Sequence, residues 1–195
     1  VLVVTFGTGI GAGIVTRGQL LQGVHGFGGE PGHMVVDRNG PPCPCGGRGC
    51  WERFASGSGL GRLARDAALG GRLGAAMALA GGDPEAVRGE HVTATARQGD
   101  DESLVLIEEL ARWMALGLAN LVNILDPAVI VMGGGLVDAA DLRLPPVRTL
   151  LGGGGVVRAH RGEGAGGRAP PAGLGVPLRH DELLDALVVE RGEGA

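Results

Sequence analysis

Four residues with metal-binding side chains lie close together in the first quarter of the chain. His33, Cys43, Cys45 and Cys50 form the pattern H-x9-C-x-C-x4-C, which contains all three cysteines of the sequence. Three thiolates and one imidazole complete a tetrahedral Zn²⁺ shell, and the glycines and prolines between them let the loop fold back sharply. A shell filled by four protein ligands is typical of a structural site, so we predict that the metal holds this loop in place. Disulfides explain the pattern less well, because three cysteines leave one unpaired.

Two glutamates flank this pattern. Glu30 lies three residues before His33, and Glu52 lies two residues after Cys50. If Zn²⁺ binds one ring nitrogen of His33, the other nitrogen can bond a ligand while the metal fixes the orientation of the ring. We expect Glu30, His33 and Glu52 to bind vicinal hydroxyl groups, as carboxylates do in sugar sites. The alternative interpretation is that both glutamates are solvated surface charges.

Two glycine turns follow apolar segments that we predict to be strands. The strand over residues 1–6 enters Gly7-Thr8-Gly9-Ile10-Gly11, and the strand over residues 129–132 enters Gly133-Gly134-Gly135. Backbone N–H groups in such turns can converge on a phosphate, and the Thr8 hydroxyl adds a donor. Each turn alone is also compatible with a plain hairpin or a packing turn. Together they predict a nucleotide cleft that is lined by Gly7, Thr8, Gly9, Gly11, Gly133, Gly134 and Gly135.

The remaining pattern predicts an α/β fold. A turn at Arg17-Gly18 makes the first glycine motif part of a hairpin, which disfavours a Rossmann or P-loop motif because both require a helix there. Helices are predicted over 56–68 and 101–125. The second repeats apolar residues at three and four positions, is capped by Asp101 or Ser103, and ends at Asp126-Pro127. The segment 70–100 is ambiguous, apart from a short helix expected after Asp83-Pro84, and a last amphipathic helix is predicted over 181–189.

Composition limits the classes of function. The 195 residues contain 44% hydrophobic and 3% aromatic residues, 40 glycines and no lysine, with a net charge of −4. This balance argues against a general nucleic-acid or membrane-surface binder. No apolar run is long enough to span a membrane and no signal peptide is visible, and a site of free thiols suits a reducing compartment. We therefore expect a cytoplasmic protein.

These motifs resemble the ROK family of sugar kinases and repressors. The resemblance rests on the hairpin from Phe6 to Val15, on Gly29-Glu30-Pro31-Gly32-His33 with the cysteine pattern through Trp51-Glu52, and on residues 121–135. It covers roughly residues 1–146. It implies an actin-like ATPase (ribonuclease H-like) large domain over residues 1–150, with an inserted zinc-binding loop over 26–52.

The resemblance implies ATP-dependent phosphorylation of glucose to glucose 6-phosphate, with structural Zn²⁺, ATP and Mg²⁺ as cofactors. It implies that Glu30, His33 and Glu52 contact the sugar and that both glycine turns line the ATP site. It also implies a homodimer or homotetramer. The alternative is the sugar-sensing domain of a ROK repressor, which would bind nucleic acid only through a helix-turn-helix ahead of residue 1. An isolated zinc module ranks last, because it leaves Glu30 and the turns without a role.

Two departures from the family pattern stand out. The family's catalytic aspartate and first phosphate loop would precede Val1, so we expect a fragment that lacks the small N-terminal domain and contains no catalytic residue of its own. Residues 151–195 are rich in glycine and arginine. A disordered tail, a shifted reading frame and genuine divergence all remain open for this segment.

Overall fold

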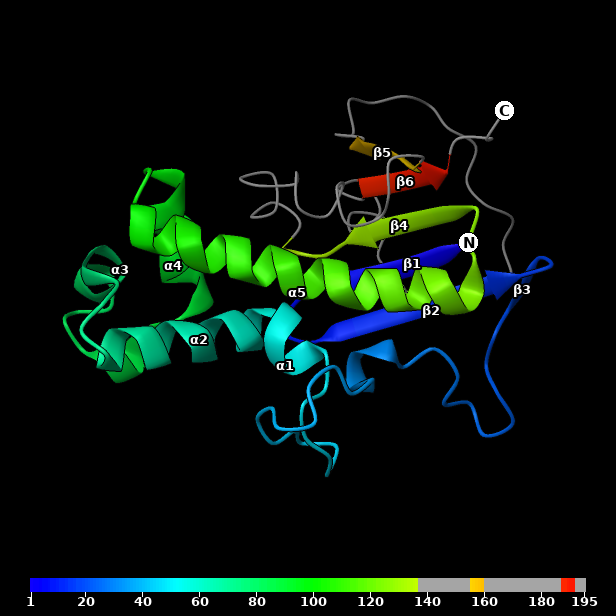
Figure 1. The fold of residues 1–195 in the computed structure, drawn as a ribbon, viewed down its shortest axis with the longest axis horizontal. Coiled ribbons are helices and arrows are strands. Elements are labelled where there is room, and N and C mark those ends of the chain that lie inside the picture. The colour runs from blue at the N-terminus through cyan, green and yellow to red at the C-terminus, as the bar shows by residue number, and fades with distance from the viewer. Residues whose placement is uncertain (137–154, 160–186, 192–195) are drawn as a thin grey trace.

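The computed structural model describes residues 1–136, 155–159 and 187–191, and it shows a mixed α/β fold (Figure 1). The helices are α1 (Glu52–Ala55), α2 (Gly57–Leu69), α3 (Gly74–Leu79), α4 (Gly89–Arg97) and α5 (Asp101–Leu125), with 3₁₀ turns η1 (Pro31–His33) and η2 (Pro84–Ala86). The strands are β1 (Leu2–Phe6), β2 (Ile10–Thr16), β3 (Gln19–Leu20), β4 (Val129–Gly133), β5 (Gly155–Ala159) and β6 (Leu187–Arg191). None of the helices in the described ranges is long and apolar enough to cross a membrane.

The strands form a sheet in the order β3-β2-β1-β4-β6-β5. β1 and β2 form an antiparallel hairpin, whereas β1 and β4 run parallel with Val3 opposite Val131 and Thr5 opposite Gly133. Parallel neighbours end at the same edge of a sheet, so the glycine turns after β1 and β4 lie next to each other. The Leu136 N–H donates to the Phe6 carbonyl at 3.1 Å and joins the two turns directly.

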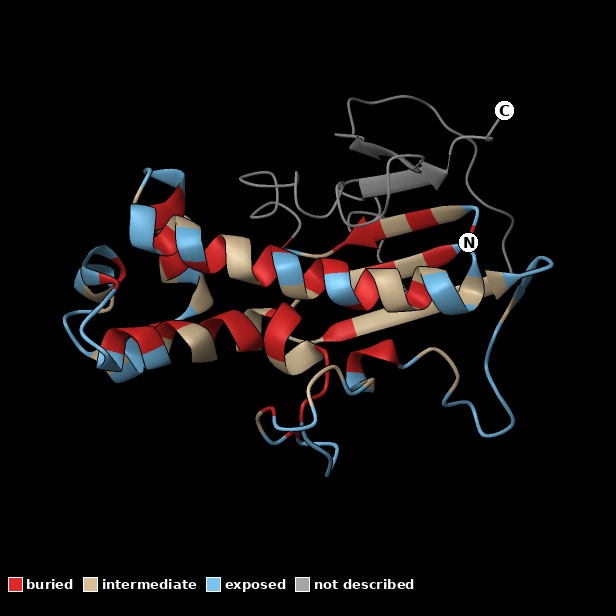
Figure 2. Ribbon diagram, viewed as in Figure 1, coloured by how far each residue is buried: buried red, intermediate tan, exposed pale blue. Residues whose placement is uncertain are grey.

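The two faces of the sheet have different roles. Side chains alternate between faces along a strand. The buried residues of β1 and β4 belong to one hydrophobic core with α5, whose buried face is visible in Figure 2: Leu2, Val4, Phe6, Ile130, Met132, Met114, Leu118 and Leu121. The alternate residues Val3, Thr5 and Val131 line a pocket instead. The sheet therefore uses one face for stability and leaves the other available for a ligand.

The zinc-pattern loop is joined to this core through Trp51. Trp51 is fully buried, its indole N–H donates to the Trp113 carbonyl, and its ring meets Phe6 edge-on with centroids 5.5 Å apart. Gly117 on α5 allows this contact, because a Cβ at that position would lie 1.9 Å from the indole. The core thus fixes the residue that follows Cys50.

We predict that Gly117→Ala destabilises the fold. Replacing an exposed helical glycine with alanine raises the free energy of unfolding by about 1 kcal/mol. Here the added methyl group would press against the buried indole, which lowers the free energy of unfolding by about 1–3 kcal/mol or more. The free energy of unfolding from urea titration should therefore fall. The neighbouring Leu116→Ala, at a half-exposed position, should change it by less than about 1 kcal/mol. Equal stability of Gly117→Ala and the parent chain would refute this packing.

The predicted elements through residue 135 are confirmed, with two refinements. The cap of α5 is Asp100, whose carboxylate accepts from the Ser103 N–H at 2.9 Å, and not Asp101 or Ser103 as predicted. Ser103 is instead buried and bonds Thr95. The short helix expected after Asp83-Pro84 is the 3₁₀ turn η2, and the ambiguous segment also contains α3 and α4.

The helix predicted over 181–189 is wrong where it can be compared. Residues 187–191 form β6, which pairs antiparallel with both β4 and β5. The Leu-Val-Val sequence is compatible with a helix and with a strand. Its backbone hydrogen bonds to the edge of β4 stabilise the strand. The other residues of that prediction, and most of the tail over 151–195, lie outside the described ranges.

Candidate functional site

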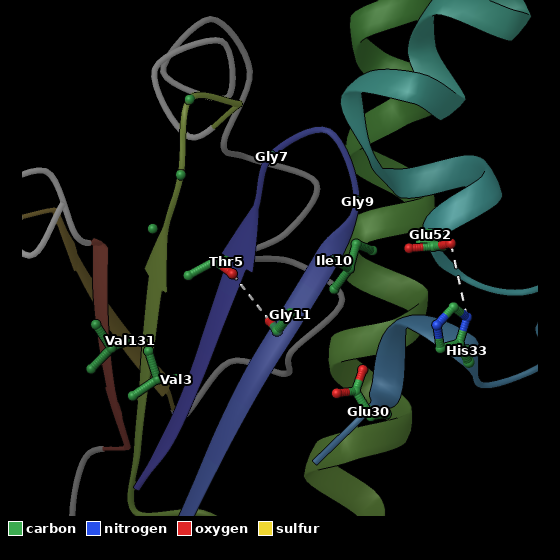
Figure 3. A pocket seen from close by; sticks show the side chains of 13 residues that line it. Val3, Thr5, Gly7, Gly9, Ile10, Gly11, Glu30, His33, Glu52 and Val131 are labelled. Carbon is green, nitrogen blue, oxygen red and sulfur yellow. Dashed lines mark hydrogen bonds and ion pairs between the residues drawn. The ribbon is translucent and has the colours of Figure 1, made fainter. Parts of the chain in front are cut away.

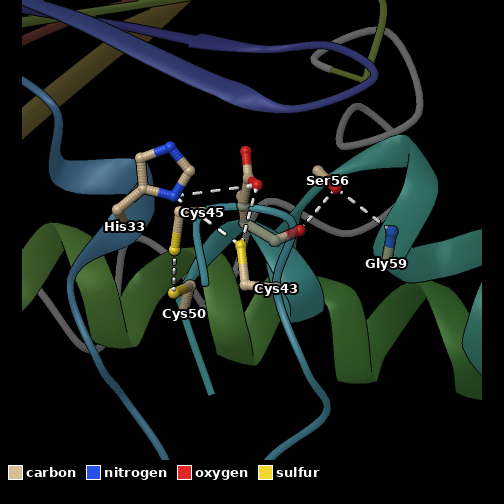
Figure 4. A network of polar contacts seen from close by, with 7 residues as sticks. His33, Cys43, Cys45, Cys50, Ser56 and Gly59 are labelled. Atoms are coloured by element: carbon tan, nitrogen blue, oxygen red, sulfur yellow. Dashed lines mark hydrogen bonds and ion pairs between the residues drawn. The ribbon is translucent and has the colours of Figure 1, made fainter. Parts of the chain in front are cut away.

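The four residues of the zinc pattern come together in the structure. All four potential ligand atoms lie within 4.8 Å of one another. The segment doubles back through two isolated bridges, Val35 with Cys50 and Pro42 with Arg48. Within the tip, the Cys43 N–H donates to the Gly47 carbonyl at 2.9 Å. Backbone bonds of the loop therefore place three sulfur atoms beside the imidazole of His33 (Figure 4).

The geometry of this cluster fits a tetrahedral zinc ion. With Zn–S and Zn–N bonds of about 2.3 and 2.0 Å, ligand atoms of such a shell lie about 3.5–3.8 Å apart. Cys45 Sγ lies 3.6 Å from Cys50 Sγ, and Cys43 Sγ lies 3.7 Å from His33 Nδ1. Neither distance allows a covalent bond, but both match edges of the tetrahedron. The His33 nitrogen nearest the sulfur atoms is Nδ1, and the rest of the ring points towards the β1–β2 hairpin (Figure 4).

The surroundings of the three sulfur atoms shift their pKa values. Burial, with a smaller contribution from the neighbouring thiols, raises the pKa of Cys50 to about 12. Burial also raises the pKa of Cys43, whereas a backbone hydrogen bond from Gly47 lowers the pKa of the exposed Cys45. Three adjacent thiolates would repel one another, so a divalent ion is the natural means of holding them deprotonated.

Glu30 and His33 are brought to one side by η1. Side chains three residues apart eclipse in a 3₁₀ turn, and the His33 N–H donates to the Glu30 carbonyl at 3.2 Å. Both side chains line a pocket of about 530 Å³, which we call the carboxylate pocket (Figure 3). Its walls also include Thr5, Ile10, Glu52, Gly9, Gly11 and Gly133–Gly135. Among the described residues, the Glu30 carboxylate makes no hydrogen bond or ion pair and remains available for a ligand.

Glu52 lies between the cysteine–histidine cluster and the first glycine turn. Its Oε1 lies 3.4 Å from Cys43 Sγ and 3.8 Å from His33 Nδ1. Its Oε2 reaches the turn, since a Cβ on Gly9 would lie 2.8 Å from it. Glu52 therefore touches the proposed zinc shell as well as the carboxylate pocket, a double position that its sequence spacing did not reveal.

The first glycine turn is held by the N-terminus of α2. The Gly57 and Ser58 N–H groups donate to the carbonyls of Gly7 and Thr8 at 2.8 and 3.2 Å. Ser56 caps this helix by accepting from the Gly59 N–H. The N–H groups of Thr8 and Gly9 make no backbone hydrogen bond among the described residues. The turn thus has its carbonyls satisfied and N–H groups left for an anion.

A second pocket lies on the other side of this turn. It has a volume of about 790 Å³ and carries three arginines, so we call it the arginine pocket: Arg53, Arg65 and Arg88, with Glu90, Gly7, Thr8, Ser58, Thr93, Gly135 and Leu136. Gly7 and Gly135 line both pockets. The charged groups give the arginine pocket a formal charge of +2 and, with His33 neutral, the carboxylate pocket −2.

All residues predicted to bind sugar or nucleotide therefore line these two pockets, whereas the arginines were missed. Gly9, Gly11, Gly133 and Gly134 line the carboxylate pocket, and Thr8 lines the arginine pocket. Gly134 needs its glycine: its φ is +95° and a Cβ would lie 2.5 Å from the Phe6 carbonyl oxygen. Arg53, Arg65 and Arg88 belong to three separate segments, and their spacing along the chain forms no motif.

Comparisons with known proteins identify the family of the chain. The ROK family model matches residues 1–153. A glucokinase of Streptomyces coelicolor is 41% identical over 150 residues, which are 76% of this chain and 47% of the relative. The chain thus spans about half the length of this relative.

Solved structures of ROK family proteins also resemble this chain. A ROK family glucokinase of Streptomyces griseus, in complex with glucose and AMPPNP, matches with a TM-score of 0.70 and 37% identity over 78% of this chain and 51% of that one. A ROK family transcriptional regulator, a homologue of the E. coli MLC protein, matches with a TM-score of 0.64 and 31% identity over 77% of this chain and 37% of that one. The chain belongs to the ROK family.

Proposed function

We propose that this chain is the sugar- and nucleotide-binding part of an ATP-dependent hexose kinase that converts glucose to glucose 6-phosphate. The observation that carries the proposal is the pair of oppositely charged pockets that share Gly7 and Gly135. A neutral polyol suits a pocket with acceptor carboxylates, and a polyphosphate suits a pocket with guanidinium groups. The shared turns then lie where the two ligands meet, as a phosphoryl transfer between them requires.

In this proposal the zinc shell consists of His33, Cys43, Cys45 and Cys50. When bound, the metal supplies rigidity and charge compensation for the thiolates. His33 presents Nε2 to a sugar hydroxyl because Nδ1 is turned to the sulfurs, and Glu30 and Glu52 accept hydrogen bonds from neighbouring hydroxyls. The loop over 26–52 is thus a zinc-stabilised insert in an actin-like large domain over 1–150.

Both glycine turns, Gly7, Thr8, Gly9 and Gly11 with Gly133–Gly135, line the ATP site. The N–H groups of Thr8 and Gly9, which make no backbone hydrogen bond within the described ranges, are donors to the phosphates, and Mg²⁺ enters on those phosphates. A cytoplasmic location and a homodimer or homotetramer stay predictions.

The ROK regulator related to the E. coli MLC protein supports a second candidate, the sugar-sensing domain of a repressor. The carboxylate pocket serves either function, because both bind a sugar. The two candidates differ in the arginine pocket: a kinase uses it for ATP, and a sensor has no need of a phosphoryl donor.

An ADP-release assay separates the two candidates. The chain is joined to the part of the S. coelicolor glucokinase that it does not match, and ADP formation is followed with glucose, fructose, N-acetylglucosamine and N-acetylmannosamine. We expect release with glucose above the sugar-free control and above the other sugars. Glucose binding without ADP release from any sugar would refute the kinase and favour the sensor, provided that the intact S. coelicolor enzyme is active in parallel.

A further inference from the structure

Arg53 is a half-buried cation without a partner. Its guanidinium makes no hydrogen bond or ion pair within the described ranges, and Nε is shielded from solvent as well as unbonded. A shielded polar group that lacks a partner costs free energy, more so when it is charged. An unpaired guanidinium in the wall of a pocket indicates that the pocket binds an anionic ligand, which would pair with that guanidinium.

The place of Arg53 in the fold indicates which part of a ligand it meets. Arg53 follows Glu52 in the short helix α1, and successive helical residues point about 100° apart. Glu52 lines the carboxylate pocket, whereas Arg53 lines the arginine pocket together with Gly7 and Thr8. The two adjacent side chains thus lie on opposite sides of the first glycine turn.

The other two arginines of the pocket are occupied differently. Arg65 Nη1 donates to the Val87 carbonyl at 3.2 Å. Arg88 Nη1 lies 3.8 Å from Glu90 Oε1. The Arg88 side chain is 74% exposed, so water screens this ion pair. Of the three, Arg53 alone combines shielding, an unpaired guanidinium within the described ranges and a position on α1 directly after Glu52.

We propose that Arg53 is a positioning residue for the phosphate chain of the donor, which it binds next to the N–H groups of the Gly7–Gly9 turn. This inference rests on the proposed function. A guanidinium binds phosphate oxygens in a bidentate manner and keeps its charge at any physiological pH. Since Cys50 and Trp51 immediately precede α1, the zinc-held loop orients Arg53 for the phosphates and Glu52 for the sugar through one short helix.

Calorimetry on the whole chain tests this role with MgATP, inorganic tripolyphosphate, adenosine and glucose as separate probes. For Arg53→Gln we expect Kd to rise about 10- to 100-fold for MgATP and for tripolyphosphate, with adenosine and glucose affinities unchanged. Arg53→Lys should recover part of the lost affinity, because lysine keeps the positive charge but cannot donate two parallel hydrogen bonds as a guanidinium does. Arg72→Gln removes an exposed arginine beyond the end of α2 and should bind all probes as the parent chain does.

Thermal melting separates a ligand role from a structural one. Removing an unpaired, shielded charge should leave Tm without ligand unchanged or raise it, while the increase in Tm caused by MgATP shrinks. A lower ligand-free Tm together with weaker binding of glucose would overturn the proposal in favour of a structural role. Equal MgATP affinity in Arg53→Gln and the parent would also overturn it. A parent chain that binds neither MgATP nor tripolyphosphate would instead refute the nucleotide assignment itself.

Discussion

Replacing Cys45 with serine should release zinc and with it the affinity for sugar. Cys45 is the exposed thiol of the cluster, so its loss removes a ligand atom with little effect on the core. Three remaining ligands hold zinc too weakly to survive dialysis against a chelator, and we expect less than about a tenth of the metal to remain. His33 and Glu30 then lose their fixed orientation, and the Kd for glucose should rise about 10- to 100-fold or more.

Metal content by mass spectrometry and glucose affinity by calorimetry check this result on the same samples. The control is Arg38→Ser, an exposed position in the same loop that holds no metal-binding atom. It should keep one zinc per chain and the affinity of the parent. Full zinc occupancy in Cys45→Ser would exclude Cys45 as a ligand, and unchanged glucose affinity in zinc-free protein would separate the metal from sugar binding.

The second large effect is expected at Glu30. Its carboxylate lines the carboxylate pocket without a partner in the described part of the chain, so a bound sugar would provide its hydrogen bonds. Hydrogen bonds to a charged group contribute about 1.5–3 kcal/mol, and Glu30→Gln should therefore weaken glucose binding about 10- to 150-fold. Zinc content should not change, because Glu30 does not belong to the cluster of His33, Cys43, Cys45 and Cys50.

Glu52→Gln provides an informative contrast. Glu52 Oε1 lies 3.4 Å from Cys43 Sγ, so this substitution should weaken glucose binding and also alter zinc retention. Glu85→Gln, at an exposed site far from the pocket in sequence, is the matched control for loss of one carboxylate. If Glu30→Gln binds glucose as tightly as Glu85→Gln does, Glu30 is a solvated surface charge and the sugar lies elsewhere.

The sequence predicted those parts of the molecule whose signals are local. Apolar periodicity located α5, apolar runs next to glycine turns located β1, β2 and β4, and the spacing of Cys43, Cys45 and Cys50 located the cluster. It failed where local signals compete. Asp100, Asp101 and Ser103 can each cap a helix, and only the backbone geometry selects Asp100. Leu187–Val189 is apolar enough for a helix, and pairing with β4 makes it a strand.

The arginine pocket was beyond sequence reasoning for a physical reason. Arg53, Arg65 and Arg88 lie on α1, on α2 and at the start of α4, and arginine is common on protein surfaces. Only the packing of α2 against α4, where a Cβ on Gly89 would lie 3.2 Å from the Gly57 carbonyl oxygen, brings them to one cavity. The double position of Glu52, against both Cys43 and the Gly9 turn, is likewise a product of tertiary structure.

The most direct test of the central claim is a crystal structure of the chain grown with zinc and glucose, with anomalous data collected at the zinc edge. The claim is that zinc fixes the loop that positions Glu30, His33 and Glu52 for binding a sugar. It predicts one anomalous peak about 2.0–2.3 Å from His33 Nδ1 and the three sulfur atoms, and a glucose within hydrogen-bond distance of Glu30, Glu52 and His33 Nε2. A metal bound without His33, or a glucose away from these three residues, would contradict it.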